Sequence, residues 1–128
     1  MGKRIGMKTY LLDTNIIIYY LNNDKIAIDF IDTHFKYASI SSITYLEVLV
    51  FSYSADEDRK VRDFLELFTI YDIDRSVIDL AIKTYRTKKI KMADNLIGLT
   101  AKQYNLTLVT RNVNDFQNMN IDILNIYE

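Results

Sequence analysis

Short apolar runs alternate along the chain with longer segments in which apolar residues recur at helical spacing. Each run is too short for an ordinary helix and fits a strand that is buried on both faces. The run LTLVT at 106–110 consists largely of residues with strong β propensity. The pattern predicts five strands, at residues 8–12, 37–41, 69–73, 106–110 and 121–126.

The segments between these runs predict six helices, which cover residues 14–22, 24–35, 42–53, 56–68, about 77–85 and 92–104. Strands that alternate with helices predict an α/β sandwich around a mostly parallel sheet. Ligands of such sheets bind beyond the carboxyl ends of the strands. We therefore expect the functional residues beyond the carboxyl ends of the strands.

Composition narrows that chemistry. The 128 residues include no Cys and one His, His34, which excludes disulfides, thiolate sites and zinc sites built from several His. There are 13 Asp and four Glu, so any metal site is built from oxygen ligands, which suit Mg²⁺, Mn²⁺ or Ca²⁺. The net charge of −1 favours no class of binding partner. Only local clusters of charged residues can indicate a partner.

Residues 1–128 are predicted to form a single domain, because the chain has no Pro, three Gly and no low-complexity linker. Met7 starts the sequence MKTYLLD, which makes residues 1–6 a candidate for a dispensable leader. The run at 10–21 is interrupted by Asp13 and Asn15 and is too short to span a bilayer. We therefore expect a cytoplasmic protein without a membrane partner.

The first candidate residues follow the first strand. Asp13 comes directly after YLL and before a helix, where an Asp commonly serves as N-cap. Asn15 lies two residues further on, in an otherwise apolar segment where a polar side chain needs a reason. The two interpretations, helix cap and functional carboxylate, both remain open for Asp13.

Glu47 is the least expected charge in the sequence. It lies in the most apolar predicted helix, where its same-face neighbours include Thr44 and Phe51. A carboxylate on such a face costs several kcal/mol unless it is paired or binds a cation. The alternative is that Glu47 reaches solvent beside Thr44.

Two further acids lie late in the chain. Asp94 begins the predicted helix at 92–104, and Asp115 follows the strand at 106–110 in TRNVNDF, together with Asn112. Each alone is also explained as a cap or turn residue. Asp13 and Asp115 are placed at carboxyl strand ends, and Glu47 and Asp94 belong to helices that can pack there.

Converging carboxylates repel one another, and a divalent cation resolves this repulsion. Such an ion keeps open positions for water and phosphate oxygens. The four acids Asp13, Glu47, Asp94 and Asp115 therefore predict a Mg²⁺ site, with Mn²⁺ as a substitute, that serves hydrolysis of phosphate esters.

A basic stretch precedes Asp94. Arg86, Lys88, Lys89 and Lys91 place four positive charges within six residues. Phosphate contacts of this kind position a nucleic acid without reading its sequence. A solvated helix end explains the same charges, so the stretch is an RNA-binding candidate and no more.

These motifs together resemble the PIN-domain ribonucleases, specifically the VapC-type toxins of toxin–antitoxin pairs. The resemblance covers the chain from Met7 onward and rests on four segments in order: YLLDTNIII at 10–18, SSITYLEVL at 41–49, KMADNLIGLTA at 91–101 and LTLVTRNVNDF at 106–116.

The resemblance implies a three-layer α/β/α sandwich and a metal site on Asp13, Glu47 and Asp94, with Asp115 in a more variable fourth position. It implies that Asn15 and Thr110 orient the acids or approach phosphate. The chain departs from the family pattern at three places: Asn112 replaces an acid of some relatives, Asn95 and Gly98 stand where many relatives have Ala, and the Pro common before the third acid is missing.

The resemblance also implies an endonuclease that cuts structured RNA such as transfer or ribosomal RNA. A homodimer and a cognate antitoxin are further implied. Two alternatives remain: a catalytically weak module that acts mainly as partner of a DNA-binding antitoxin, and an aspartate-based phosphatase. Tyr19 and Tyr20 are candidates for a dimer or antitoxin surface, although aromatic residues at helical spacing are more often part of the core. The phosphatase requires an acid two residues after Asp13, where the sequence has Asn15.

Overall fold

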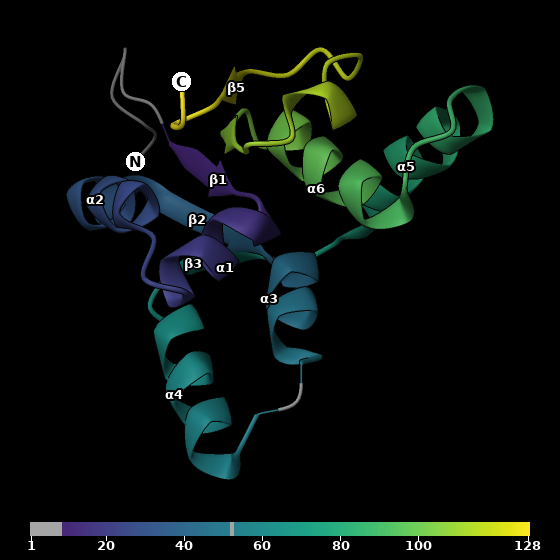
Figure 1. Cartoon of the computed structure of the whole chain (residues 1–128). Coiled ribbons are helices and arrows are strands. Elements are labelled where there is room, and N and C mark those ends of the chain that lie inside the picture. The colour runs from purple at the N-terminus through teal and green to yellow at the C-terminus, as the bar shows by residue number, and fades with distance from the viewer. Residues whose placement is uncertain (1–8, 52) are drawn as a thin grey trace.

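The computed structural model describes residues 9–51 and 53–128 (Figure 1). Its centre is a five-stranded sheet in the order β3-β2-β1-β4-β5, in which every neighbouring pair is parallel. The candidate leader at residues 1–6 lies outside the described residues. The strands are β1 (Tyr10–Leu12), β2 (Ala38–Ser41), β3 (Thr69–Tyr71), β4 (Thr107–Val109) and β5 (Ile123–Leu124).

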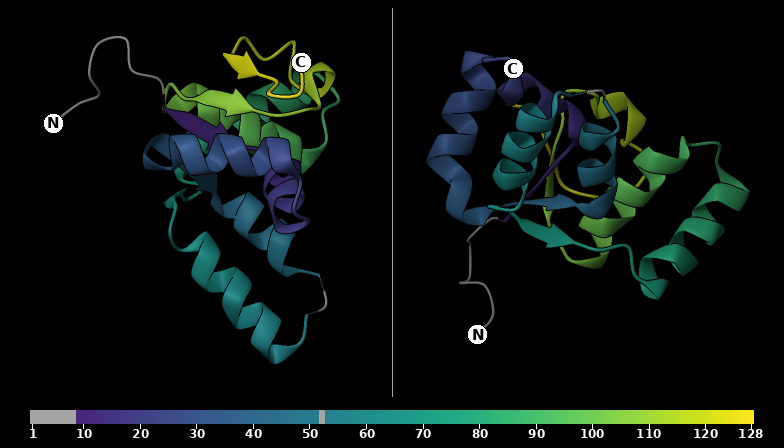
Figure 2. Two further views of the ribbon diagram at one scale, coloured as in Figure 1. Left: turned by 60° about the vertical axis from the view of Figure 1, so that its left-hand side comes forward. Right: turned by 90° about the horizontal axis from the view of Figure 1, so that it is seen from below.

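Helices cover both faces of the sheet (Figure 2). They are α1 (Thr14–Leu21), α2 (Lys25–His34), α3 (Ser42–Leu49), α4 (Ala55–Leu65), α5 (Arg75–Thr87) and α6 (Met92–Gln103), with short 3₁₀ turns η1 (Phe35–Tyr37) and η2 (Val113–Asp115). Within the described ranges, each of these helices is too short or too polar to cross a membrane.

Alternate residues of the inner strands divide the core into two halves. Leu11 and Leu108 pack with α5 and α6, whereas Leu12 and Val109 pack with α1 to α4. Successive side chains of a strand point to opposite faces of the sheet. A strand whose successive side chains are all buried is therefore covered on both faces. The three-layer α/β/α sandwich with a parallel sheet is confirmed.

Several predicted ends move inward. The helix predicted at 42–53 ends at Leu49, and the helix predicted at 56–68 runs from Ala55 to Leu65. Ser54 begins α4 through a capping box with Glu57, because each side chain accepts a hydrogen bond from the other residue's backbone N–H. The last strand is two residues long instead of the predicted six.

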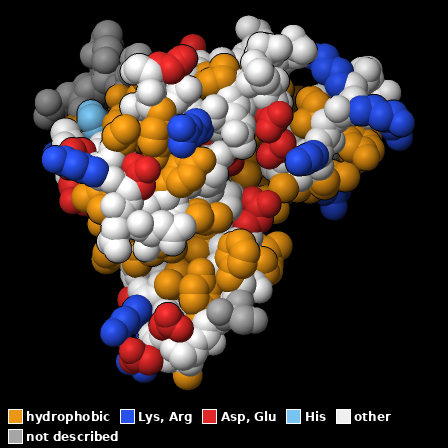
Figure 3. All heavy atoms as spheres, in the orientation of Figure 1, with side chains coloured by type: hydrophobic (Ala, Val, Ile, Leu, Met, Phe, Trp, Pro, Cys, Tyr) orange, Lys and Arg blue, Asp and Glu red, His pale blue; other side chains and the backbone are white. Residues whose placement is uncertain are grey.

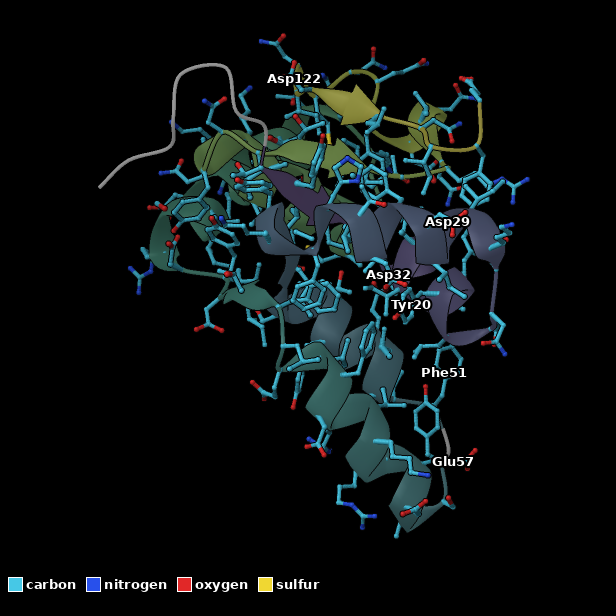
Figure 4. The ribbon with its side chains drawn as sticks, turned by 90° about the vertical axis from the view of Figure 1, so that its left-hand side faces the viewer. Tyr20, Asp29, Asp32, Phe51, Glu57 and Asp122 are labelled. Carbon is cyan, nitrogen blue, oxygen red and sulfur yellow. The ribbon has the colours of Figure 1, made fainter. Side chains whose placement is uncertain are left out.

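Tyr19 and Tyr20 are engaged within the chain. The Tyr20 ring stacks on Phe64, with centroids 4.8 Å apart, and its hydroxyl donates to Asp32 at 3.3 Å (Figure 4). The Tyr19 ring packs edge-on against Tyr127 at 5.5 Å. Both rings are half-buried between helices and the chain's C-terminal residues, which is the core role that aromatic residues at helical spacing usually have.

The strand order fixes where a site can form. From β1 the chain moves to β2 and β3 on one side, and later to β4 and β5 on the other. The sheet therefore reverses its order of strands between β1 and β4, and ligands of open α/β sheets bind at such a switch point. The Asp13 N–H donates to the Val109 carbonyl at 2.9 Å, which places Asp13 at this point.

Candidate functional site

Asp13 lies at the switch point with both carboxylate oxygens held. Its Oδ1 accepts from the Thr14 backbone N–H at 2.8 Å, and its Oδ2 accepts from the Thr110 hydroxyl at 2.8 Å. The side chain is 5% exposed. Asp13 caps α1, as one of its two interpretations predicts. Capping uses Oδ1 alone, and the bond from Thr110 comes from the neighbouring strand end.

The environment of Asp13 opposes its negative charge. Burial raises the pKa of this carboxyl from 3.8 to about 6, the bonds from Thr110 and Thr14 oppose that rise, and the charges of Asp94 and Glu47 add to it. A carboxyl group whose pKa is raised by burial and by neighbouring acids, at the end of a strand, is a candidate for a functional site. It also shows that three of the four predicted acids are close enough to influence one another.

Glu47 reaches this group from α3. Its Oε1 accepts from the Thr14 hydroxyl at 2.5 Å, and the same Thr14 oxygen lies 3.0 Å from the Thr44 hydroxyl. Thr44 itself is buried, and its N–H donates to the Ser41 hydroxyl, which caps α3. Thr14 therefore connects the end of β1 to Glu47. Sequence reasoning missed Thr14, although its place between Asp13 and Asn15 was a signal.

Glu47 is half-buried, and this exposure lies between the two interpretations that the sequence leaves open. Val50 and Phe51, which directly follow α3, are 67% and 56% exposed, and Leu46 is also exposed. Glu47 lies at the edge of this surface. Because α3 lies at the margin of the sandwich, one side of an apolar helix faces outward.

Asp94 lies in the first turn of α6 and is half-buried. The N-cap of α6 is Lys91, so the interpretation of Asp94 as a helix cap is wrong. Burial raises the pKa of Asp94, the charges of Asp115 and Glu47 raise it further, and Lys91 lowers it. The charge of Asp94 thus interacts with those of Asp115 and Glu47.

Asp115 is exposed in the 3₁₀ turn η2, and its backbone N–H donates to the Asn112 carbonyl at 3.1 Å. The segment directly after this turn packs closely on α6 at Gly98, where an added Cβ would lie 2.5 Å from the Met119 sulfur and 3.2 Å from the Phe116 ring. A larger residue at position 98 would first have to displace the flexible end of the Met119 side chain.

A cavity of about 380 Å³ opens beside Asp94 and Asp115. Its lining combines these two acids with lysines 88, 89 and 91 and with amide side chains of the turn after β4. The Lys88 ammonium donates to the Asn118 carbonyl at 2.5 Å, which fastens the segment between α5 and α6 to that turn. Arg86 lines a different, apolar cavity on α5 and α6, so the structure does not place it with the three lysines.

The surface view gives the same arrangement. Acidic side chains lie in the middle of the face between α3 and the α5–α6 pair, with basic side chains on both sides of them (Figure 3).

The predicted supporting residues take different positions. Thr110 bonds Asp13 and also accepts from the Asn112 N–H at 3.0 Å, whereas the Asn112 side chain is exposed. The Oδ1 atoms of Asn15 and Asn95 are buried without a hydrogen-bond partner. The Asn95 amide donates to the Ala81 carbonyl at 3.2 Å, which fastens α6 to α5. Buried oxygens without a hydrogen-bond partner are uncommon in proteins. A bound water or a functional role usually explains them.

The donor chemistry fits a hard divalent cation, since four carboxylates meet beside two threonine hydroxyls. Among residues 9–51 and 53–128, however, no three acidic or histidine side chains already stand in ligand geometry. Glu47 and Asp13 are turned toward Thr14 and Thr110. The acids converge but are not preassembled as ligands.

A family model of the PIN domain matches residues 10–121. The chain belongs to the PIN domain family. The match includes Asp13, Glu47, Asp94 and Asp115, together with the neighbouring strands β1 and β4. No curated protein sequence matches this PIN domain.

Solved structures agree with this membership. A toxin–antitoxin complex from Klebsiella pneumoniae is 28% identical with a TM-score of 0.81, over 94% of this chain and 99% of that one. VapBC-1 from nontypeable Haemophilus influenzae is 25% identical, with a TM-score of 0.79 and coverages of 94% and 99%. FitAcB from Neisseria gonorrhoeae is 25% identical, with a TM-score of 0.77 over the same shares. The likeness of this PIN domain to VapC-type toxins is thereby confirmed.

Proposed function

We propose that this PIN domain is a metal-dependent endoribonuclease, the toxin of a cytoplasmic toxin–antitoxin pair, which hydrolyses phosphodiester bonds in structured RNA such as transfer or ribosomal RNA. One observation carries the proposal. Carboxylates from four separate segments interact near the switch point of the sheet, and two of them, Asp94 and Asp115, line a cavity together with three lysines. Such a site suits a cation and a polyanion together.

Asp13, Glu47, Asp94 and Asp115 would hold Mg²⁺, with Mn²⁺ as a substitute. A bound ion of this kind lowers the pKa of water and offsets charge on a phosphate. Asp13 is fixed by Thr14 and Thr110, whereas Asp115 is exposed and has the most freedom to turn toward a ligand. The rigid acid would anchor the site and the exposed acid would complete it.

Lys88, Lys89 and Lys91 would bind phosphates on either side of the cleaved bond. All three are exposed and line the same cavity as Asp94 and Asp115. Asn112 and Asn15 would approach the phosphate or orient the acids. Arg86 belongs to this RNA surface only if RNA continues along α5, since it lines another cavity.

The sequence after β1 disfavours the aspartate-based phosphatase. That chemistry needs a second acid two residues after the nucleophilic carboxylate, and this position is Asn15, which is neutral. Absence of an acid-labile aspartyl phosphate after incubation with phosphodonors is the expected result.

The partner surfaces are proposed from exposed apolar side chains. A cavity of about 470 Å³ between α1 and α4 is lined in part by the exposed Phe51, and its chain neighbour Val50 is exposed as well. We assign this surface to the cognate antitoxin. A second apolar patch on α5 and α6 includes Ile82 and Tyr85, and we assign it to a homodimer. Ile82→Glu should yield monomers in sedimentation and should keep antitoxin binding. Val50→Glu should lose antitoxin binding and should keep the dimer.

Cleavage of purified RNA tests the function directly. Incubation of total RNA with the full chain and Mg²⁺ should give discrete cuts with 5′-phosphate and 3′-hydroxyl ends, because water and not the ribose 2′-hydroxyl attacks phosphorus. Cyclic phosphate ends, or cuts that persist in EDTA, contradict the proposal. A chain that cuts no RNA but still binds the antitoxin would be the catalytically weak alternative.

Calorimetry with Mn²⁺ tests the metal site independently of cleavage. Asp94→Asn should weaken Mn²⁺ binding while the fold remains intact, and without metal the variant should be as stable as the parent or more so, since one repulsive charge is gone. Unchanged Mn²⁺ affinity would exclude Asp94 as a ligand.

A further inference from the structure

Asp115 stands between two cavities. One is the cavity with the three lysines, and the other has a volume of about 440 Å³. Asn114 and Asp115 line both of them. The second cavity is otherwise lined by Arg111, Asn112, Val113, Asn125 and Glu128. Asp115 therefore borders two polar cavities, and each cavity contains at least one cationic side chain.

Arg111 is held in place by two aromatic rings. Its guanidinium carbon lies 4.5 Å from the centre of the Tyr127 ring and 5.7 Å from that of Tyr19. The electron-rich faces of the two rings attract the guanidinium charge. Tyr127 is itself fixed, because its hydroxyl donates to Asp24 at 3.1 Å. The rings thus restrict where this arginine can point.

The N–H groups of Arg111 remain available to a ligand. Among residues 9–51 and 53–128 the ion pairs are confined to α4, and Arg111 makes none. The side chain is exposed, and Glu128, the other charged residue beside Asp115 in this cavity, is exposed as well. A guanidinium supplies paired donors that match the oxygens of a phosphate.

We infer that Arg111, placed by Tyr127, is a second phosphate-binding site for the RNA strand, in the cavity beside Asp115 that Lys88, Lys89 and Lys91 do not line. The inference rests on the proposed nuclease function and extends it. An RNA strand would cross the acids from one cavity to the other. Asn112 and Asn125 add amide donors along that path.

Binding of RNA without cleavage is the first test. Anisotropy of a labelled RNA hairpin is followed in EDTA with the full chain over about 50–200 mM salt, where each lost phosphate contact lowers the salt slope by about 0.7–0.9. Arg111→Gln should lower the slope by one such step and weaken binding about tenfold, as expected for loss of a charged hydrogen bond. Arg111→Lys should keep the slope and recover part of the affinity.

A matched control removes the same charge elsewhere. Arg59 is exposed on α4 and paired with Asp56, so Arg59→Gln should leave the slope unchanged. An Arg111→Gln slope equal to that of the parent or of Arg59→Gln overturns the inference. A variant that binds RNA normally but loses antitoxin binding also overturns it, because Arg111 would then serve the protein partner.

The second test asks on which side of the cut each cavity acts. Once the cleaved bond is mapped, RNAs are shortened from either end and binding is measured again in EDTA. Arg111→Gln should remove the affinity gained from nucleotides on one side of the bond, and the triple Lys variant the gain from the other side. Loss of the same side by both variants contradicts the crossing path.

Failure of the inference and failure of the proposed function are distinguishable. If the parent chain binds and cuts RNA while Arg111→Gln behaves like the parent, the inference alone is wrong. If the parent shows no salt-dependent RNA binding, both are wrong. Thermal melting of Arg111→Lys, which retains the contact with Tyr127, controls for lost packing.

Discussion

The two sides of the acid cluster differ in how the protein holds them. On the closed side, Asp13 and Glu47 are bonded to Thr110 and Thr14 against the end of the sheet. On the open side, Asp94 and Asp115 face a cavity with Lys88, Lys89 and Lys91. The closed side has its partners within the protein, whereas the open side leaves space for ligands. Changes to the closed side should therefore alter stability and chemistry together, and changes to the lysines of the open side should alter RNA binding alone.

The largest expected effect comes from the centre of the closed side. Asp13→Asn should abolish cleavage even at saturating Mg²⁺, because the rigid acid is lost. Asp122→Asn removes the same charge from an exposed position and should leave cleavage unchanged (Figure 4). Cleavage rates of the three proteins on one RNA check this, and measurable activity in Asp13→Asn would show that the closed side is only a helix cap.

The same variant has a predicted effect on stability that depends on pH. Since the folded-state pKa of Asp13 is raised from 3.8 to about 6, the folded chain binds this proton more tightly than the unfolded chain. Stability in EDTA should therefore fall as pH rises from about 4 to 6, by about 3 kcal/mol. Asp13→Asn should lack this fall and be more stable at pH 7. Denaturant unfolding at several pH values provides the measurement, and parallel curves for variant and parent would contradict it.

The next effect sharpens the comparison without touching an acid. Thr110→Val keeps the shape of the side chain but removes the donor to Asp13, which should lower activity by about 10–100-fold, as for other groups that orient metal ligands. The pKa of Asp13 should rise further, since the bond from Thr110 opposes its elevation. Thr110→Ser retains the hydroxyl and should retain most of the activity. Equal activities of the Val and Ser variants would show that this bond is dispensable.

On the open side, replacement of Lys88, Lys89 and Lys91 by Gln should weaken RNA binding and lower its salt slope by about 2, if each lysine contacts one phosphate. Thermal stability should change little, because all three side chains are exposed. Lys88 has one contact to lose, its bond to the Asn118 carbonyl. Salt slopes equal to those of the parent would mean that the lysines are only a solvated surface.

The smallest effect is expected at the only histidine, on neither side of the cluster. The His34 ring stacks on Phe30, with centroids 4.3 Å apart, and its Nδ1 lies 2.9 Å from the Phe30 carbonyl. His34→Ala should cost about 0.5–1.5 kcal/mol of stability, the worth of such a ring pair. The cleavage rate and its pH profile should remain unchanged. A changed pH profile would show that His34 takes part in cleavage as a base, in addition to the two sides of the acid cluster.

The sequence by itself determined the layers of this protein and the identity of its acids. Uncharged runs of strong β formers such as LTLVT favour burial on both faces, so the alternation of strands and helices left few architectures open. Asp13 was recognisable because it directly follows a strand, and Glu47 because it interrupts an apolar helix. Both signals are local, and local pattern is what a sequence displays.

Tertiary structure decided how those acids are held and what lies beside them. The bond from Thr110 to Asp13 joins residues 97 positions apart, and Thr14 reaches Glu47 across 33 positions. No spacing rule predicts such pairs, because they depend on β4 lying beside β1 and on α3 packing against α1. Arg111 and Tyr127 likewise meet only because both follow neighbouring strands of the finished sheet. Sequence pattern specifies elements, whereas the contacts between distant elements exist only once the sheet has assembled.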